Sequence, residues 1–154
     1  MDLYNLVGED CVFSKLKAGS KKQALQEIAD RAAKTTGLES RLIFDKLLER
    51  ERLGTTGVGQ GIAIPHGKFE SLDRIYGLFA RLEVPVEFES MDDQPVDLIF
   101  VLLAPEPSGA DHLKALARVS RLLRNQSMCE KLRGAKNQDA IYALLTESAK
   151  PHAA

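Results

Sequence analysis

The sequence predicts a single α/β domain whose sheet is covered by helices on both faces, and three observations support this. Apolar residues recur at helical spacing over residues 20–36, 40–53 and 110–124. Residues 75–88 alternate between apolar and polar side chains, as in a half-buried strand. Residues 96–104 are almost continuously apolar, which is typical of a strand buried on both faces. Because helices and strands mix along 154 residues, we expect one domain with one core.

The first elements carry recognisable start and stop signals. We expect a strand near residues 11–16 and then a helix that begins after Ser20, where Ser20 and Gln23 fit a capping box. Gly37 ends this helix, and a second helix follows over residues 40–53. The side chains expected on the inner face of the second helix are Leu42, Ile43, Leu47 and Leu48.

The middle of the chain is marked by glycine and proline. Four glycines within residues 54–61 predict a loop that approaches another group closely, not a packed element. Residues 62–64 resemble a short strand that ends at Pro-His-Gly, residues 65–67. Pro85 interrupts the alternating run and predicts an edge or a bend.

The last third of the chain is predicted to be helical. After the helix over residues 110–124, residues 128–132 and 140–145 are expected to form two more helices. Asn137 is the expected N-cap of the last one. The final residues, 149–154, are expected to be a flexible tail.

Composition excludes several classes of function. The 21 basic and 22 acidic residues give a net charge of −1, so there is no general attraction for nucleic acid or an anionic membrane. No apolar run approaches ~18 residues and no basic segment opens the chain, so we expect neither a spanning helix nor a signal peptide. Cys11 and Cys129 are far apart and lack partners at zinc-ligand spacing. We therefore expect a cytoplasmic protein without metal or cofactor.

His66 is the first candidate for chemistry. It lies between Pro65 and Gly67, directly after the glycine-rich loop. Pro65 has a fixed φ and Gly67 permits a sharp exit, so the imidazole would be held at a defined and accessible place. The tripeptide alone favours an idle, hydrogen-bonded histidine at a turn, because short motifs often occur by chance.

His112 is the second candidate, because it falls in the first turn of the helix over residues 110–124. The apolar residues that share its face are Leu116, Val119 and Leu123. Its ring should therefore point inward, at a helix end that favours anions and that Ser108 could cap. A partly buried core histidine is the alternative.

Arg50 is the third candidate, at the end of the second helix and next to the glycine-rich loop. A guanidinium there could bind a phosphoryl group through two hydrogen bonds. The alternating charges of residues 49–52 are also typical of a solvated helix face, and Lys46 and Arg52 are nearby alternatives.

Other kinds of site fit the sequence poorly. The glycine-rich loop lacks the Gly-Lys-Ser/Thr step of a Walker A motif, and a strand rather than a helix should follow it. No Gly-x-Ser-x-Gly segment is present. Two histidines without a clear third ligand make a weak metal site, and Asp92-Asp93 belongs to a turn that we expect to be solvated.

These motifs together resemble a known family. Residues 59–67, Gly-Gln-Gly-Ile-Ala-Ile-Pro-His-Gly, resemble the active-site signature of the enzyme IIA proteins of the bacterial phosphoenolpyruvate phosphotransferase system, mannitol/fructose type. Within that type, residues 50–59 resemble the nitrogen-regulatory branch, enzyme IIA-Ntr. Residues 93–100 and 111–113 add supporting similarity, so the resemblance covers nearly the whole chain.

The resemblance implies an enzyme IIA type-2 domain over residues 3–148, with a mixed sheet of about five strands flanked by helices on both faces. It implies that His66 accepts a phosphoryl group from a phosphohistidine on a small HPr-like carrier. It further implies that His112 assists by hydrogen bonding and that Arg50 is the family's active-site arginine. Which ring nitrogen of His66 reacts is left open.

The role expected of such a carrier is regulatory. No enzyme IIB, IIC or HPr-like segment accompanies the domain, so we expect it to signal its phosphorylation state to target proteins. The alternative is a sugar-specific fructose/mannitol-type enzyme IIA that passes the phosphoryl group to an enzyme IIB. A binding module without phosphorylation, and a hydrolase with His66 as base, are more distant alternatives.

Overall fold

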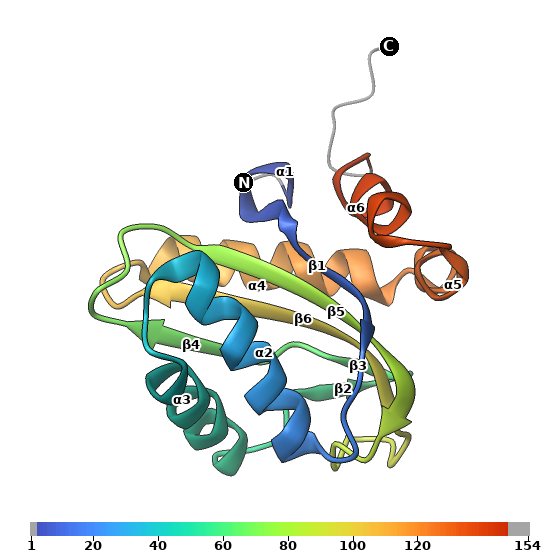
Figure 1. Ribbon diagram of the computed structural model, residues 1–154, viewed down its shortest axis with the longest axis horizontal. Coiled ribbons are helices and arrows are strands. Elements are labelled where there is room, and N and C mark those ends of the chain that lie inside the picture. Colours follow the sequence, from blue (N-terminus) through green and yellow to red (C-terminus); the bar gives the residue numbers. More distant parts are fainter. Residues whose placement is uncertain (1–2, 148–154) are drawn as a thin grey trace.

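The computed structural model describes residues 3–147, which form one six-stranded sheet with helices packed against it (Figure 1). The helices are α1 (Leu3–Leu6), α2 (Lys21–Thr36), α3 (Ser40–Arg52), α4 (Gly109–Arg124), α5 (Gln126–Gly134) and α6 (Gln138–Glu147). The strands are β1 (Val7–Leu16), β2 (Gly57–Gly59), β3 (Ile62–Ala63), β4 (His66–Phe69), β5 (Tyr76–Val86) and β6 (Val96–Pro105). The predicted tail over residues 149–154 lies outside the described residues.

The sheet has the order β1-β5-β6-β3-β2, and β4 pairs with β6 beyond β3. β5 and β6 are antiparallel, whereas β1 runs parallel to β5, and β3 and β4 run parallel to β6. β3 and β4 occupy successive stretches of the same edge of β6, since Ile62 pairs with Leu98 and His66 pairs with Leu102. The predicted mixed sheet of about five strands, covered by helices on both faces, is confirmed.

Two predictions about the middle of the chain are wrong. The glycine-rich segment is not all loop, because residues 57–59 form β2 and pair with β3. His66 does not end a strand but begins β4. Pro65 has no N–H to donate, so the ladder breaks at this point, while the Pro65 carbonyl still accepts a hydrogen bond from Leu102 N at 3.0 Å and holds the chain beside β6.

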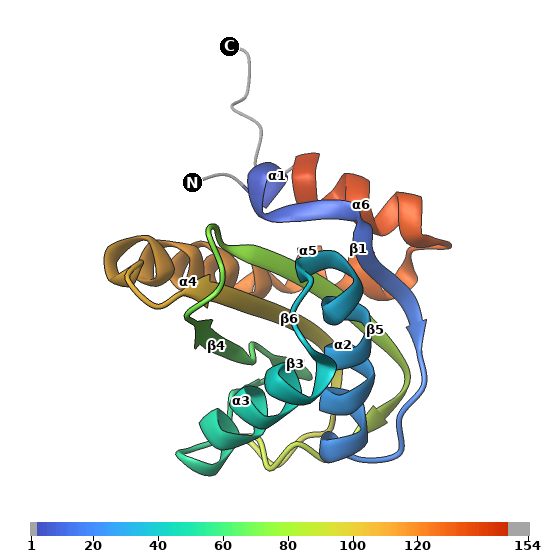
Figure 2. The same cartoon turned by 60° about the vertical axis from the view of Figure 1, so that its left-hand side comes forward.

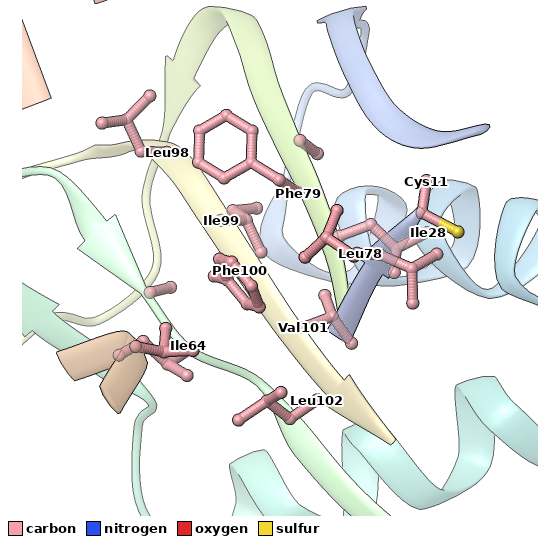
Figure 3. Packing of buried hydrophobic residues seen from close by; sticks show 14 of the residues in the cluster. Cys11, Ile28, Ile64, Leu78, Phe79, Leu98, Ile99, Phe100, Val101 and Leu102 are labelled. Carbon is pink, nitrogen blue, oxygen red and sulfur yellow. The ribbon is translucent and has the colours of Figure 1, made fainter. Parts of the chain in front are cut away.

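The core lies on both faces of β6. Its residues from Leu98 to Ala104 are buried, which confirms the prediction from the continuous apolar run. Figure 3 shows this packing around Phe79 on β5 and Phe100 on β6, whose rings meet edge to face at 6.3 Å. α2 and α3 cover one face of the sheet and α4 covers the other (Figure 1), while α6 packs against α1 and β1 (Figure 2).

The helix signals are mostly confirmed. Ser20 Oγ accepts a hydrogen bond from Gln23 N at 3.1 Å, and Gly37 ends α2 in the left-handed conformation with φ 78°. The reciprocal bond differs from a capping box, because Gln23 Oε1 accepts from Gly19 N at 2.6 Å. Asn137 caps α6 through Ala140 N. On α3, Leu42 is exposed, so its place on the inner face was wrong.

The remaining sequence expectations differ in smaller ways. β1 begins at Val7, earlier than predicted, and α1 was not predicted at all. Pro85 lies where the register between β5 and β6 shifts, so the predicted interruption is present, but β5 is not an edge strand because it lies between β1 and β6. Across residues 3–147, each helix is too short or too polar to cross a bilayer.

Candidate functional site

The structure brings the three candidate side chains into one cleft. Arg50 comes from the end of α3, His66 from the start of β4 and His112 from the first turn of α4. Arg50 Nε donates to His66 Nε2 at 3.2 Å, and the rings of His66 and His112 are 5.5 Å apart between centroids, edge to face. All three line a cleft of about 620 Å³.

The hydrogen bonds of His66 assign the tautomer of its ring. Nδ1 lies 2.9 Å from the carbonyl oxygen of Ile64, and a carbonyl can only accept, so Nδ1 carries the hydrogen. Nε2 accepts from Arg50 and therefore keeps its lone pair, directed toward the cleft. The Ile64 side chain is buried in the core (Figure 3), which holds its carbonyl in place.

The protonation state of His66 suits a nucleophile. Burial lowers the pKa of His66 below its ordinary value of 6.5, and the Arg50 guanidinium lowers it further. The bond to Ile64 acts in the opposite direction without reversing the shift. The ring is therefore neutral at neutral pH, and Nε2 is unprotonated, with its electron pair accepting the hydrogen bond from Arg50.

His112 is buried, with 5% of its surface exposed, and its ring contacts that of His66 on β4, so it turns inward as predicted. Its Nε2 has no hydrogen-bond partner among the described residues. An unpartnered buried polar atom costs about 1–3 kcal/mol, so a group in the cleft that bonded to Nε2 would remove this cost. Burial, followed by the charges of His66 and Lys68, lowers the pKa of His112 to about 4.

This shift predicts that His112 makes folding depend on pH. The unfolded chain protonates this ring near 6.5 and the folded chain near 4, so stability is lost as pH falls through that window. We expect the wild type to lose about 2 kcal/mol more than a His112→Gln variant, less than the full shift implies because water reaches the cleft. Urea unfolding of both proteins at pH 7 and near pH 4 would measure this. Equal losses would contradict it.

Arg50 is positioned by the loop that follows it. Its Nη1 donates to the carbonyl of Gly54 at 2.8 Å, which keeps the guanidinium beside His66. Of the two alternatives considered from the sequence, Lys46 lines the same cleft, whereas Arg52 is exposed and does not line it. Arg50, and not Arg52, is therefore the arginine that lines the cleft and contacts His66.

The start of α4 differs from the expectation in one respect. Ser108 is the N-cap residue, but its hydroxyl donates to the carbonyl of Pro105 at 2.6 Å and does not accept from the helix. The Ser108 carbonyl accepts from His112 N at 2.8 Å. The first turn of the helix therefore begins without a side-chain cap, next to the cleft that holds His112.

The loop between β2 and β3 is held by hydrogen bonds to the backbone N–H and the carbonyl of Gln60. Gln60 N donates to Asp92 Oδ2 at 2.8 Å, and Gln60 O accepts from Arg133 Nη2 at 2.8 Å. Arg133 also forms an ion pair with Asp97 at 2.8 Å. Gly61 has φ 82°, which favours glycine, and a Cβ there would displace the Arg133 guanidinium, which lies 2.6 Å from that position. Asp92 is exposed as expected, but it also holds the loop.

Sequence reasoning missed a buried polar network behind Arg50. Glu51 is 6% exposed, and its Oε1 accepts from Lys21 Nζ at 2.8 Å and from Thr56 N at 3.0 Å. Its Oε2 accepts from the Thr56 hydroxyl. A signal was available, because Glu51 follows Leu47 by four residues and so continues the inner face of α3. The network ties α2, α3 and the loop after Arg50 together.

The donors in the cleft favour an anion. Arg50, Lys46 and Lys68 supply positive charge, and Glu49 and Glu106 line the rim. No group of three or more His, Cys, Asp or Glu side chains within residues 3–147 is arranged to hold a metal ion. A neutral imidazole nucleophile beside a guanidinium suits a group that carries negative charge through the reaction.

Comparison with known proteins identifies the family. Residues 5–148 match the family described as "Phosphoenolpyruvate-dependent sugar phosphotransferase system, EIIA 2". The chain belongs to this family. It is therefore an enzyme IIA type-2 protein, and phosphoryl transfer is the chemistry of the system to which it belongs.

The relatives of this enzyme IIA protein include both branches of the family. A nitrogen regulatory protein of Bradyrhizobium diazoefficiens is 58% identical over 94% of this chain and 95% of its own. The crystal structure of IIA-Ntr from Neisseria meningitidis superimposes with a TM-score of 0.89 at 33% identity, over 94% of this chain and 99% of its own. A fructose-specific component of Haloferax volcanii is 37% identical, over 83% of this chain and 84% of its own. The predicted resemblance is confirmed, and the enzyme IIA-Ntr similarity is the stronger.

Proposed function

We propose that this enzyme IIA protein accepts a phosphoryl group on His66 Nε2 from the phosphohistidine of an HPr-like carrier, and that regulatory target proteins read its phosphorylation state. The observation that carries the proposal is the pair of hydrogen bonds on the His66 ring. Ile64 O holds the proton on Nδ1, and Arg50 Nε marks the direction of the Nε2 lone pair.

The transfer step follows from this tautomer. The Nε2 lone pair attacks phosphorus, a P–Nε2 bond forms, and the P–N bond of the donor phosphohistidine breaks. The donor ring takes back the electron pair of the broken bond and becomes neutral. His66 keeps its Nδ1 proton, so its ring becomes positively charged, and the Ile64 carbonyl 2.9 Å away stabilises that charge.

Arg50 and His112 have separate roles in this proposal. When Nε2 is phosphorylated it can no longer accept from Arg50, so the Nε–H of Arg50 turns to a phosphoryl oxygen. His112 Nε2, which lacks a partner, hydrogen bonds to a second oxygen. Both groups lie beside Nε2 before the reaction, so Arg50 needs only to release the Nε2 lone pair and turn to a phosphoryl oxygen as the P–Nε2 bond forms.

The surface around the cleft supports a protein as the donor. Leu53 and Leu113 both line the cleft, and they are 82% and 68% exposed. Large apolar side chains at the rim of a reactive site are typical of a protein contact surface. A relay requires such a surface, because donor and recipient proteins must reach His66 in turn.

We expect Leu53→Asp and Leu113→Asp to raise the KM for the phosphohistidine carrier about tenfold each, because each replaces an apolar contact by a charge. The rate with the small donor phosphoramidate should fall much less, since that molecule needs no docking surface and responds only to the added charge. Val84→Asp is the matched control, because Val84 is 68% exposed and lines a different cavity. An equal effect of all three substitutions would contradict the assignment of this surface.

The regulatory branch is favoured over sugar transport, because the nitrogen regulatory protein of Bradyrhizobium diazoefficiens is 58% identical to this chain and the fructose-specific component of Haloferax volcanii is 37% identical. The alternative is transfer to an enzyme IIB. Rapid loss of the phosphoryl group to a fructose- or mannitol-type IIB protein would support that alternative and exclude a mainly regulatory role.

The experiment that tests the proposal is intact-protein mass spectrometry after incubation with phosphoenolpyruvate and the general carriers. We expect one acid-labile phosphoryl group on the wild type and none on His66→Ala. The His112→Ala variant should still be phosphorylated, but slowly, because it retains the nucleophile. An unmodified wild type, with carriers that are active on a control acceptor, would refute the proposal.

A further inference from the structure

Two cationic side chains of the cleft are left without a role by the proposed function. Lys46 lies one turn before Arg50 on α3, and Lys68 lies two residues after His66 on β4. Both line the cleft, and neither forms an ion pair within residues 3–147. An unpaired lysine that lines a cleft beside a nucleophile is available to bind an anion.

Lys68 lies on the same strand as His66, whereas Lys46 lies on α3. Side chains two residues apart on a strand project from the same face, so Lys68 emerges beside His66. Lys68 is exposed, and its four-carbon stem is free to swing over the cleft. Its charge reaches His112, where it is one of the causes that lower the pKa of that ring. An ammonium group that disfavours a positive charge on the His112 ring favours a negatively charged group beside that ring.

The residues already assigned bring little positive charge to the phosphoryl group. A phosphoryl group in transfer carries negative charge on three equatorial oxygens. Arg50, whose Nη1 is held by the Gly54 carbonyl, brings one positive charge to these oxygens, and the neutral His112 brings none. Lys68 lines the same cleft and supplies a further positive charge that these oxygens can share.

We propose that Lys68 is a further catalytic residue of this site, whose ammonium binds the equatorial oxygens of the phosphoryl group as it passes to His66 Nε2. The inference rests on the proposed function and deepens it. Lys68 neither gives nor takes a proton in the step. It offsets charge while the donor P–N bond breaks and the P–Nε2 bond forms, and the electron pair returns to the donor nitrogen as before.

The test compares two phosphoryl donors on four full-length proteins. The proteins are the wild type, Lys68→Met, Lys68→Arg and Lys34→Met. Lys34 is the matched control, because it is exposed, at the end of α2, and lines a different cavity. The donors are the phosphohistidine carrier and phosphoramidate, which transfers its phosphoryl group without docking. Single-turnover rates are measured by the mass of the intact chain.

We expect Lys68→Met to slow transfer from both donors about tenfold, as the loss of one partly screened charge contact implies. Lys68→Arg should restore most of the rate, because it retains the charge, and Lys34→Met should match the wild type. Raising the salt concentration should reduce the difference in transfer rate between the wild type and Lys68→Met, because salt screens the charge of Lys68.

Three results would overturn the inference. If Lys68→Met matches Lys34→Met with both donors, Lys68 has no part in transfer. If only the carrier reaction slows, Lys68 contacts the partner protein and not the phosphoryl group. If the wild type takes no phosphoryl group from either donor, the proposed function itself fails. If the wild type is active and Lys68→Met reacts at the same rate, only the inference about Lys68 fails.

Discussion

Replacing Arg50 by methionine is expected to slow phosphoryl acceptance by His66 about a hundredfold, because one preorganised charged donor is lost. The guanidinium lies between the Gly54 carbonyl and His66 Nε2, at 2.8 and 3.2 Å, so it is already aimed at the atom that would bond to phosphorus. The measurement is a single-turnover rate with phosphoramidate as donor, which removes any effect on docking.

The control for Arg50 lies two residues along the chain. Arg52 is exposed and does not line the cleft, so Arg52→Met removes the same charge from the same helix end without touching the site. We expect its rate to be within about twofold of the wild type. Equal rates for Arg50→Met and Arg52→Met would show that the guanidinium serves only the loop.

Glu51→Ala is expected to destabilise the fold by about 3–5 kcal/mol, which is the usual cost of leaving one charge of a buried pair without its partner. Lys21 Nζ would lose its 2.8 Å ion pair, and Thr56 would lose both of its hydrogen bonds to the carboxylate. Chemical unfolding in urea measures the free energy of unfolding directly. Glu49→Ala is the control, since Glu49 is exposed on the same helix and should change stability by about 0.5 kcal/mol or less.

A double variant separates the cost of a broken pair from the value of the pair itself. Lys21→Met with Glu51→Leu replaces both charges by apolar side chains of similar length, so we expect it to recover much of the stability lost in Glu51→Ala. A double variant as unstable as the single one would show that the bonds to Thr56, not the charge pair, carry the effect.

Helices and long strands of this fold could be predicted because their signals are local. The stop at Gly37, the cap at Asn137 and the apolar run of β6 each need only a few neighbouring residues. β2 could not be predicted, because three residues with two glycines have no strand pattern of their own. They are a strand only because β3 lies beside them.

In the candidate site, too, the local features could be predicted from the sequence and the contacts between distant residues could not. Pro65 and Gly67 identify His66 as a held imidazole, and helical spacing turns His112 inward. The hydrogen bond from Arg50 to His66 joins residues sixteen positions apart, so its existence depends on how α3 packs against β4. The same holds for the tautomer, which depends on where the Ile64 carbonyl points. Glu51 was missed because charged residues are rarely buried without a partner of opposite charge, and its partner Lys21 is far away in the sequence.

The central claim is that His66 Nε2 is the phosphoryl acceptor. The most direct test is a long-range ¹H–¹⁵N correlation spectrum of the phosphorylated protein with ¹⁵N-labelled histidine. We predict that the phosphorus coupling and the shifted nitrogen resonance belong to Nε2 of His66, with Nδ1 still protonated. Phosphorylation at Nδ1, or at any other residue, would contradict the account.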